Sequence, residues 1–516
     1  MKSHRFGSGL AVGVILTTLI AAPVGVLNAG HAGGAPDITV TPAPPVNGNG
    51  TTLATTNFDL SQIGYESSQF FISGTAVPYV NTSTVPLTSD GHWNVAPLSR
   101  SGPYAEAYKT RIVVYRPIDP SRFNGTVIVE WLNDTADAFT CVPSCPGTDT
   151  PPEYAVMWSG AHTEMVRQGF AWVGVSAQPV GVEALQSIDP TDYSTLVHPG
   201  APWSYDIFSQ AGQAIRGDSS QILGNLRPRR LIATGDSQSA DWLMPYIDGV
   251  QPVTHTYDGF LIDGQWAGLG LNGMPSGINL DPGIALDATP VPITVRSDLG
   301  VPVFEFETET DVAMSELYDR TFYGNPRLFR LWEIAGGAHI DAYDGSNDVG
   351  NGQAEVENLA AMQKPPTGAG CALPENTGGT HWVLDAAVSW VNRWVEDGVP
   401  PPEAPNLQIE TGSPGSPPIT FAVDANGNAL GGVRSPQVDA PVAKLSGIGN
   451  SGFGLCSLEG TTTPFNANQL RALYNSHRQF VFRWRLASFF DVIRGYLLPA
   501  DAINLDRAAD ASQIGD

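Results

Sequence analysis

Several short segments of this chain are apolar on successive residues, and this feature constrains the fold more than any other. The segments are rich in β-branched and aromatic residues and are mostly bounded by Gly, Pro or Asn. They are residues 110–115, 126–131, 171–176, 230–234, 259–263, 301–307 and 329–334. A strand without a polar face must be covered on both sides, as in a mostly parallel sheet between two layers of helices.

Helix-compatible segments lie between and after these strands. In one of them, residues 381–396, the positions of Trp390, Val391 and Trp394 approximate helical spacing. The other segments are residues 154–168, 238–246, 316–322 and, near the end of the chain, 468–498. Strands that alternate with helices predict the α/β fold class, with a mostly parallel central sheet flanked by helices.

The chain divides by composition into a lead-in, a core and a C-terminal region. Residues 33–55 are rich in Gly, Pro, Thr and Ala without a lasting period, which indicates an extended lead-in. The strands and helices of the predicted core fall within residues 56–400. Two stretches of the core, 265–299 and 340–380, exceed normal connection lengths and are expected to be cap-like insertions. Residues 401–516 follow Pro-rich connectors and are expected to form an appendage that packs on the core.

The N-terminus has the pattern of an export signal over residues 1–32. Lys2 and Arg5 form a charged start, and an apolar run over residues 10–26 precedes small residues around Ala29 and Ala32. The run is at the short end for a membrane span, so a retained anchor is the weaker alternative. We therefore expect a protein that is secreted or held in the cell envelope, without a stable membrane span in the mature chain.

The charge balance bears on the partners. The 26 Lys and Arg residues stand against 51 Asp and Glu residues, which gives a formal net charge of −25. Such a field repels phosphate backbones and anionic lipid surfaces, so nucleic acid is not expected as a partner. A negative surface is also a general means of solubility, so it does not identify a cationic substrate.

The four cysteines are Cys141, Cys145, Cys371 and Cys456, and an even number in an exported chain favours disulfides. Three pairings are possible. The short spacing between Cys141 and Cys145 favours a disulfide in that loop and a second one between Cys371 and Cys456. A metal site is the weaker interpretation, because no C-x-x-C or histidine-containing ligand spacing accompanies these residues.

The most informative motif is Gly235-Asp236-Ser237-Gln238-Ser239, which follows a predicted strand and precedes a helix-compatible stretch. This is the context of a nucleophile elbow, a tight turn that needs small neighbours and exposes a serine above the sheet. Gly235 and Ser239 meet the size condition, although Gly is the usual residue at the second position. The alternative is an ordinary helix N-cap at Asp236, Ser237 or Ser239.

A nucleophilic serine needs a histidine base, which in turn needs a carboxylate, in the chain order serine, acid, histidine. His339 lies in a Gly-rich loop after the strand 329–334 and is our candidate base. Asp311 is our candidate acid, because its distance beyond the strand 301–307 leaves room for a short loop to turn back. Glu309 is the main rival for this role and Asp263 the third.

An acyl-transfer site also needs two donors for the oxyanion of the tetrahedral intermediate. The backbone N–H of Gln238, which follows the serine, is the first candidate. The strand 126–131 ends where the second donor should lie, so Leu132 or Asn133 is the second candidate.

No cofactor or metal is expected. Residues 268–273 match the dinucleotide pattern G-x-G-x-x-G, but the sequence that follows does not open a helix that could hold a pyrophosphate. Asp344, Asp348 and Glu355 imitate part of a calcium loop, in which the sixth position must be Gly but is Val349.

Several motifs together resemble a known family. They are Trp131-Leu132-Asn133, Gly174-Val175-Ser176-Ala177-Gln178, Gly235-Asp236-Ser237-Gln238-Ser239, Leu331-Trp332-Glu333, Gly336-Gly337-Ala338-His339 and Gly431-Gly432-Val433-Arg434-Ser435-Pro436. From about residue 55 to 465 the chain is similar to the secreted bacterial α/β-hydrolase domain-containing proteins. The resemblance implies an α/β-hydrolase fold and a triad of Ser237, an acid at Asp311 or Glu309, and His339.

These features together predict an exported serine hydrolase that cleaves a carboxylic ester through an acyl-enzyme. The substrate would be a small-molecule or lipid-like ester. Two alternatives remain open at this stage. The same triad could serve an acyltransferase or an amidase, or the chain could be a catalytically silent binding protein that kept the fold.

Overall fold

The computed structural model describes residues 37–44, 52–55, 58–83, 85–134, 153–268, 292–320, 327–346 and 354–516. Residues 36–516 form one compact unit. The predicted signal peptide lies outside the described residues. Among the helices within these ranges, none combines the length and apolarity needed to cross a bilayer.

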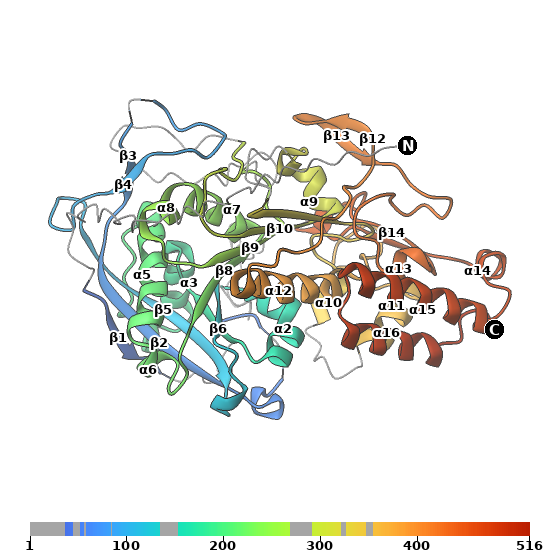
Figure 1. Cartoon of the computed structure of the whole chain (residues 1–516), viewed down its shortest axis with the longest axis horizontal. Helices are drawn as coiled ribbons and strands as arrows, with labels where there is room; N and C mark the ends of the chain where they lie inside the picture. Colours follow the sequence, from blue (N-terminus) through green and yellow to red (C-terminus); the bar gives the residue numbers. More distant parts are fainter. Residues whose placement is uncertain are drawn as a thin grey trace, which may run out of the picture. The chain divides into compact units, whose positions relative to one another are not determined.

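A nine-stranded sheet forms the centre of this unit, in the order β1-β2-β5-β7-β6-β8-β9-β10-β11 (Figure 1). The strands are β1 Thr39–Pro42, β2 Tyr65–Ala76, β5 Glu106–Pro117, β6 Thr126–Trp131, β7 Ala171–Val175, β8 Arg230–Asp236, β9 Gly259–Asp263, β10 Val303–Thr308 and β11 Phe329–Ile334. The pairings from β7 through β11 are all parallel. β5 is antiparallel to both β2 and β7, and β1 is antiparallel to β2. The predicted α/β class with a mostly parallel sheet is confirmed.

Successive residues of the inner strands face opposite layers, which explains their unbroken apolar runs. In β8, Leu231 and Ala233 join a core cluster with residues of helices α5 (Ser204–Gly217) and α7 (Gln238–Pro245). Ile232 joins a second cluster with residues of helices α2 (Val156–Gln168) and α12 (Thr380–Asp397). All three side chains are fully buried. The sheet is therefore covered on both faces, as the sequence predicts.

The helices of these two layers and the shorter helices follow the strands along the chain. The larger ones are α2 Val156–Gln168, α3 Pro179–Ile188, α5 Ser204–Gly217, α7 Gln238–Pro245 and α12 Thr380–Asp397. The shorter ones are α4 Pro190–Tyr193, α6 Ser219–Ile222, α8 Gln251–Thr254, α9 Glu309–Met314, α10 Ala342–Ser346, α11 Ala354–Gln363 and α13 Pro436–Asp439. Helices α10 and α11 lie within the predicted insertion 340–380.

The helix expected over residues 316–322 is wrong for the part that is described. The helix in this region, α9, begins earlier, because Thr308 and Asp311 form a capping box at its first turn. Glu316 and Leu317 then adopt positive φ angles of 50° and 67°, which a continuous helix does not allow. Only a 3-10 turn over Tyr318–Arg320 remains.

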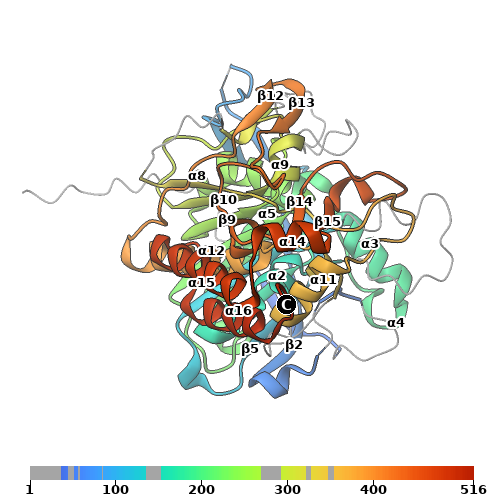
Figure 2. The same ribbon diagram turned by 90° about the vertical axis from the view of Figure 1, so that its right-hand side faces the viewer.

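The C-terminal region packs beside the end of the sheet. The helix-like segment 468–498 is divided into α14 Ala467–Leu473 and α15 His477–Arg494, and α16 Pro499–Ala511 follows (Figure 2). The division occurs at Ser476, whose side chain caps α15 by accepting the N–H of Gln479. Trp484 and Leu505 of this region share a core cluster with Val312 of α9.

Three small antiparallel strand pairs lie outside the central sheet in the described part of the chain. They are β3 Tyr79–Asn81 with β4 Val95–Pro97, β12 Ile409–Ser413 with β13 Ser416–Phe421, and β14 Ala443–Ser446 with β15 Thr461–Pro464. At the β11 edge, Ile334 and Val433 form an isolated parallel bridge, which ties the C-terminal region to the sheet.

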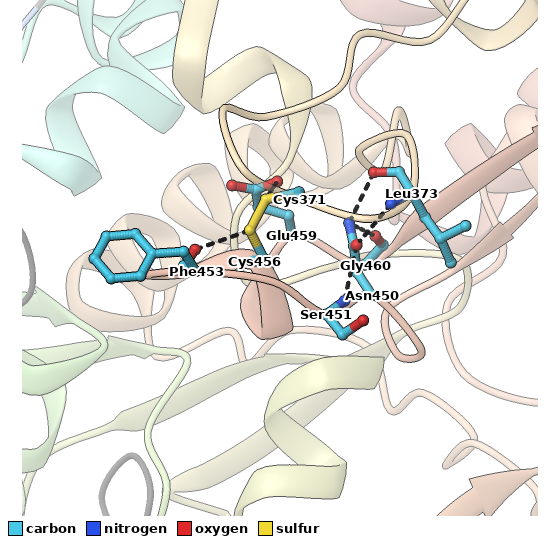
Figure 3. Close-up of a disulfide and its surroundings, with 8 residues drawn as sticks. All are labelled: Cys371, Leu373, Asn450, Ser451, Phe453, Cys456, Glu459 and Gly460. Atoms are coloured by element: carbon cyan, nitrogen blue, oxygen red, sulfur yellow. Dashed lines mark hydrogen bonds between the residues drawn. A yellow bond between two sulfur atoms is a disulfide. The ribbon is translucent and has the colours of Figure 1, made fainter.

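Cys371 and Cys456 form a disulfide, with their Cα atoms 5.3 Å apart (Figure 3). It joins the segment before α12 to the C-terminal region, so the predicted pairing of these two cysteines is confirmed. Cys141 and Cys145 lie outside the described residues. The carboxylate of Glu459 lies close to the two sulfur atoms, but a disulfide has no thiolate to offer a metal ion.

Asn450 reinforces the same connection (Figure 3). Its side-chain oxygen accepts the N–H of Leu373 at 3.2 Å, and its amide donates to the carbonyl of Gly460 at 2.9 Å. The disulfide and this amide therefore hold the segment before α12 against residues 450–460.

Candidate active site

Ser237 occupies the turn between β8 and α7. Its φ and ψ angles are 56° and −124°, a conformation that costs a residue with a side chain about 1–3 kcal/mol. The backbone N–H of Ser237 donates to the carbonyl of Asp263 at 2.9 Å, which ties the turn to the end of β9. Ser237 therefore lies at the tip of a tight, strained turn between a strand and a helix, which is the geometry that a nucleophile elbow requires.

The neighbours of Ser237 explain the motif. A Cβ atom on Gly235 would lie 2.9 Å from the carbonyl oxygen of Ser239, so the turn leaves no room for a side chain there. The hydroxyl of Ser239 donates to the carbonyl of Asp236 at 2.8 Å and accepts its N–H at 3.0 Å. Ser239 therefore replaces the usual glycine with a residue that braces the turn.

His339 and Asp311 form a hydrogen-bonded pair. The Nδ1 atom of His339 lies 2.6 Å from Oδ1 of Asp311, and both side chains are almost fully buried. The other carboxylate oxygen of Asp311 accepts the N–H and the hydroxyl of Thr308 at 2.8 and 2.5 Å. Asp311 thus lies in the first turn of α9 rather than in the free loop that we expected, and its capping role fixes the direction of its carboxylate.

The two rival acids have other partners. Glu309 accepts the N–H groups of Gly336 and Gly447 at 2.7 and 2.9 Å, and so braces the loop that carries His339. Asp263 ends β9 and offers its backbone carbonyl to Ser237. Of the three carboxylates, the structure brings Asp311 against the imidazole.

His339 lies against Gly264, just beyond the end of β9. A Cβ atom on Gly264 would lie 2.7 Å from Nδ1 of His339 and 3.3 Å from Oδ1 of Asp311. Gly264 directly follows Asp263, whose carbonyl binds the N–H of Ser237. Ser237 and the His339–Asp311 pair therefore contact adjacent residues of one turn, although they come from strands β8, β10 and β11.

Two residues around His339 escaped the sequence analysis. The indole Nε1 of Trp266 donates to Oδ1 of Asp311 at 3.1 Å, and its rings lie against the imidazole with centroids 5.0 Å apart. The hydroxyl of Thr310 accepts the backbone N–H of His339 at 3.1 Å. The only sequence signal for either residue is its position just after a strand that leads to the site.

The electrostatics separate Asp311 from its acidic neighbours. Burial acts to raise the pKa of Asp311, but the charge of His339 and the hydrogen bonds from His339 and Thr308 outweigh it and lower the pKa below its ordinary value. Burial and the nearby carboxylates instead raise the pKa of Asp236 and of Asp263 well above the ordinary value. Asp311 is therefore the negative charge that faces the histidine.

A small cavity adjoins His339 between the strand ends and helices α2 and α12. It is lined by Val156, Gly160, Asp236, Asp263, Thr308, His339, Asp341, Asp344, Thr380, His381 and Leu384. Burial raises the pKa of Asp344 to about 6 and that of Asp341 further. The cavity carries less negative charge than its four carboxyl groups suggest.

The three candidate oxyanion donors differ in whether their backbone N–H groups already have an acceptor. The N–H of Gln238 is the first of α7, and first-turn N–H groups have no acceptor within their helix. The N–H groups of Leu132 and Asn133, in contrast, donate to the carbonyls of Val175 and Tyr154 at 3.2 and 3.1 Å. Neither is available to an oxyanion in this conformation, because each completes a backbone ladder.

The side chain of Gln238 has its own partner, which the sequence did not indicate. Its amide exchanges hydrogen bonds with that of Gln178 at 2.5 and 3.0 Å, and the N–H of Asp134 lies 3.5 Å from its Oε1. The side-chain amide of Asn133 donates to the carbonyl of Asp236 at 2.9 Å. These contacts hold the ends of β6 and β7 against the start of α7.

The sequence was also compared with models of known protein families. Residues 37–507 match the α/β-hydrolase domain family, which is most of the chain. The chain belongs to this family. The sheet, in which β5 runs opposite to both of its neighbours β2 and β7 and the strands from β7 to β11 are parallel, agrees with that assignment.

The solved structures to which the chain is similar include esterases of low sequence identity. One is a fungal esterase structure from Rhizomucor miehei, which is 10% identical to this chain with a TM-score of 0.32. The match covers 56% of this chain and 81% of the esterase chain. A carboxylesterase from Lactobacillus plantarum WCFS1 gives 11% and 0.24, over 50% and 84%. An α/β serine hydrolase without a lid from Xanthomonas campestris gives 13% and 0.24, over 50% and 85%. No curated protein matches the chain.

Proposed function

We propose that this α/β hydrolase cleaves carboxylic esters through an acyl-enzyme on Ser237. The observation that carries the proposal is the hydrogen bond between Nδ1 of His339 and Asp311, next to a serine held in an elbow conformation. In the neutral imidazole this bond holds the proton on Nδ1, so that Nε2 is the atom that can accept a proton from a serine hydroxyl.

In the proposed reaction, the hydroxyl oxygen of Ser237 attacks the ester carbonyl while His339 accepts its proton. His339 then gives this proton to the departing alcohol, and the acyl group stays on Ser237. Water attacks the acyl-enzyme with the same base assistance, which releases the acid and restores the serine. Asp311 stabilises the imidazolium in both steps, and the N–H of Gln238 donates to the oxyanion.

We also propose that the protein is exported. The N-terminal pattern supports this, and the disulfide between Cys371 and Cys456 adds support, because structural disulfides persist in oxidising compartments. A small or lipid-like ester is the proposed substrate.

The test is hydrolysis of p-nitrophenyl esters of increasing acyl length by the wild type and two matched variants. Ser237→Ala should abolish turnover and leave the thermal unfolding unchanged. Ser239→Ala removes a hydroxyl that braces the same turn and should lower turnover only in part, because the nucleophile and its backbone bond to Asp263 remain. Equal turnover by Ser237→Ala and the wild type would refute the serine mechanism, and no turnover by any folded sample would favour a binding protein. Ester products with an added alcohol would instead indicate acyl transfer.

A further inference from the structure

Helix α15 lies on the outside of the C-terminal region (Figure 2), and several of its large apolar side chains are exposed. Phe482 and Ile493 are 65% and 69% exposed, and Phe489 is 57% exposed. Leu486 and Phe490 are also exposed. Large apolar side chains that gather in this way on a surface indicate an interaction site.

The helical spacing places these side chains together. At about 100° per residue, Phe482, Leu486, Phe489, Phe490 and Ile493 fall within an arc of about 100°. The buried side chains of the helix, which include Phe480, Val481 and Trp484, fall on the opposite side and pack into the core cluster of the C-terminal region. The exposed arc is therefore a second apolar face, and we call its five residues the α15 stripe.

Arginines border the α15 stripe on both sides. By the same spacing, Arg478 and Arg485 lie along one edge, and Arg483 and Arg494 lie along the other. All four are exposed. Arg485 also pairs with Asp510 of α16, and Arg494 lies 3.8 Å from Asp491.

The local charge differs from that of the whole chain. Residues 466–516 contain six arginines and five aspartates, whereas the chain has 26 basic and 51 acidic residues. The stripe and its border thus form a weakly basic region on a strongly acidic protein. Repulsion from the remaining charge is screened beyond about 8 Å at physiological ionic strength, so it does not prevent contact at this face.

The charge pattern decides between two occupants of the stripe. A second copy of α15 packed on the stripe would bring arginine edges against arginine edges, and like charges that flank an apolar seam oppose pairing. A phospholipid surface offers acyl chains to the stripe and phosphate oxygens to both edges. An apolar arc between basic borders is the arrangement of helices that lie in the plane of a membrane.

We propose that α15 docks this protein on the surface of an anionic phospholipid bilayer, with the stripe in the acyl boundary and the bordering arginines on the lipid phosphates. This docking does not depend on the ester hydrolysis proposed above. A Ser237→Ala variant should bind vesicles as the wild type does, so the two proposals can fail separately.

The test is co-sedimentation of the full chain with vesicles of phosphatidylcholine and phosphatidylglycerol. Wild-type protein should sediment with them. The double variant Phe482→Ser/Ile493→Ser should bind at least about tenfold more weakly, because two apolar side chains of the α15 stripe no longer enter the bilayer. The matched control is Phe453→Ser, which removes a phenylalanine that is 80% exposed elsewhere in the C-terminal region and should leave binding unchanged. Arg478→Gln/Arg483→Gln should reduce the preference for phosphatidylglycerol over pure phosphatidylcholine.

A local readout separates α15 from the apolar run at residues 10–26, which could bind vesicles by itself. Hydrogen exchange with mass spectrometry should show slower exchange in peptides of α15 when vesicles are added, and not in the stripe variant. Equal sedimentation of wild type and stripe variant without this slowing would overturn the proposal. A wild-type dimer in light scattering that the stripe variant converts to a monomer would also overturn it, in favour of a second copy.

Discussion

The substitution Asp311→Asn isolates the role of one carboxylate in the proposed triad. Oδ1 of Asp311 faces Nδ1 of His339 at 2.6 Å and Nε1 of Trp266 at 3.1 Å, and the other oxygen accepts two groups of Thr308. Asparagine has one acceptor oxygen. If that oxygen stays with Thr308, its NH₂ group faces His339, which must then carry its proton on Nε2 and can no longer accept one from Ser237.

The expected loss is large. The wrong histidine tautomer lowers kcat by about 10⁴-fold in a serine triad, which corresponds to about 5 kcal/mol at 1.36 kcal/mol per decade. The assay is kcat for the best p-nitrophenyl ester, with thermal unfolding as a check of folding. The matched control is Glu309→Gln, because Glu309 accepts the N–H groups of Gly336 and Gly447 and not the imidazole.

Glu309→Gln should keep kcat within about tenfold. The NH₂ group of the glutamine would face one of the two N–H groups that Glu309 now accepts, and the loss of that hydrogen bond should cost about 1–3 kcal/mol of folding stability. A folded Asp311→Asn enzyme with kcat close to the wild type would refute the assignment of the acid. A loss in Glu309→Gln as large as that in Asp311→Asn would refute it as well.

Three further predictions concern the surroundings of the site and the stability of the fold. Trp266→Phe removes the hydrogen bond to Asp311 and keeps a ring against His339, so kcat/KM should fall about tenfold; an unchanged value would exclude a positioning role. Reduction of the Cys371–Cys456 disulfide opens a loop of 85 residues and should lower the free energy of unfolding by up to about 4–5 kcal/mol, measured by urea titration with and without reductant. Burial raises the pKa of Glu130 from 4.5 to about 8, so the folded state keeps a proton that the unfolded state releases, and stability should fall as the pH rises through this window. Glu130→Gln should flatten this pH dependence of Tm, and an equally steep dependence in the variant would contradict the assignment to Glu130.

The sheet was predictable where its strands are buried on both faces. Residues 126–131 and 259–263 were predicted with the bounds that the structure shows, because both faces of these strands demand apolar residues. β2 was missed, since its Ser67, Ser68 and Gly74 interrupt the apolar pattern of a strand that lies near the antiparallel edge. Its pairing with β5 along all 12 residues decides the structure there, and pairing between distant segments leaves little trace in local composition.

Buried polar helices were similarly hidden. α5 buries Ser209, Gln210 and Asp206 as well as its apolar residues, and the carboxylate of Asp206 pairs with Arg100 at 2.7 Å. A local pattern of polar residues indicates an exposed helix or a loop, and only the distant partner explains the burial.

The candidate site was also predictable only in part. The order of serine, acid and histidine along the chain predicted the candidate residues of the triad, because each of them lies just beyond a strand that ends at the same edge of the sheet. The choice between Asp311 and Glu309 depended on the start of α9, where the capping box turns Asp311 toward His339 and leaves Glu309 toward Gly336. Trp266 could not be predicted, since its role arises from the approach of one loop to another.

The measurement that tests the central claim most directly is labelling of the purified, folded protein with a fluorophosphonate, followed by mass spectrometry of the modified peptide. We predict a single modification at Ser237, its loss in Ser237→Ala, and its retention in Ser239→Ala. Modification of a different serine, or the same labelling in Ser237→Ala, would contradict the proposed nucleophile. No labelling of a folded sample would contradict an active serine hydrolase.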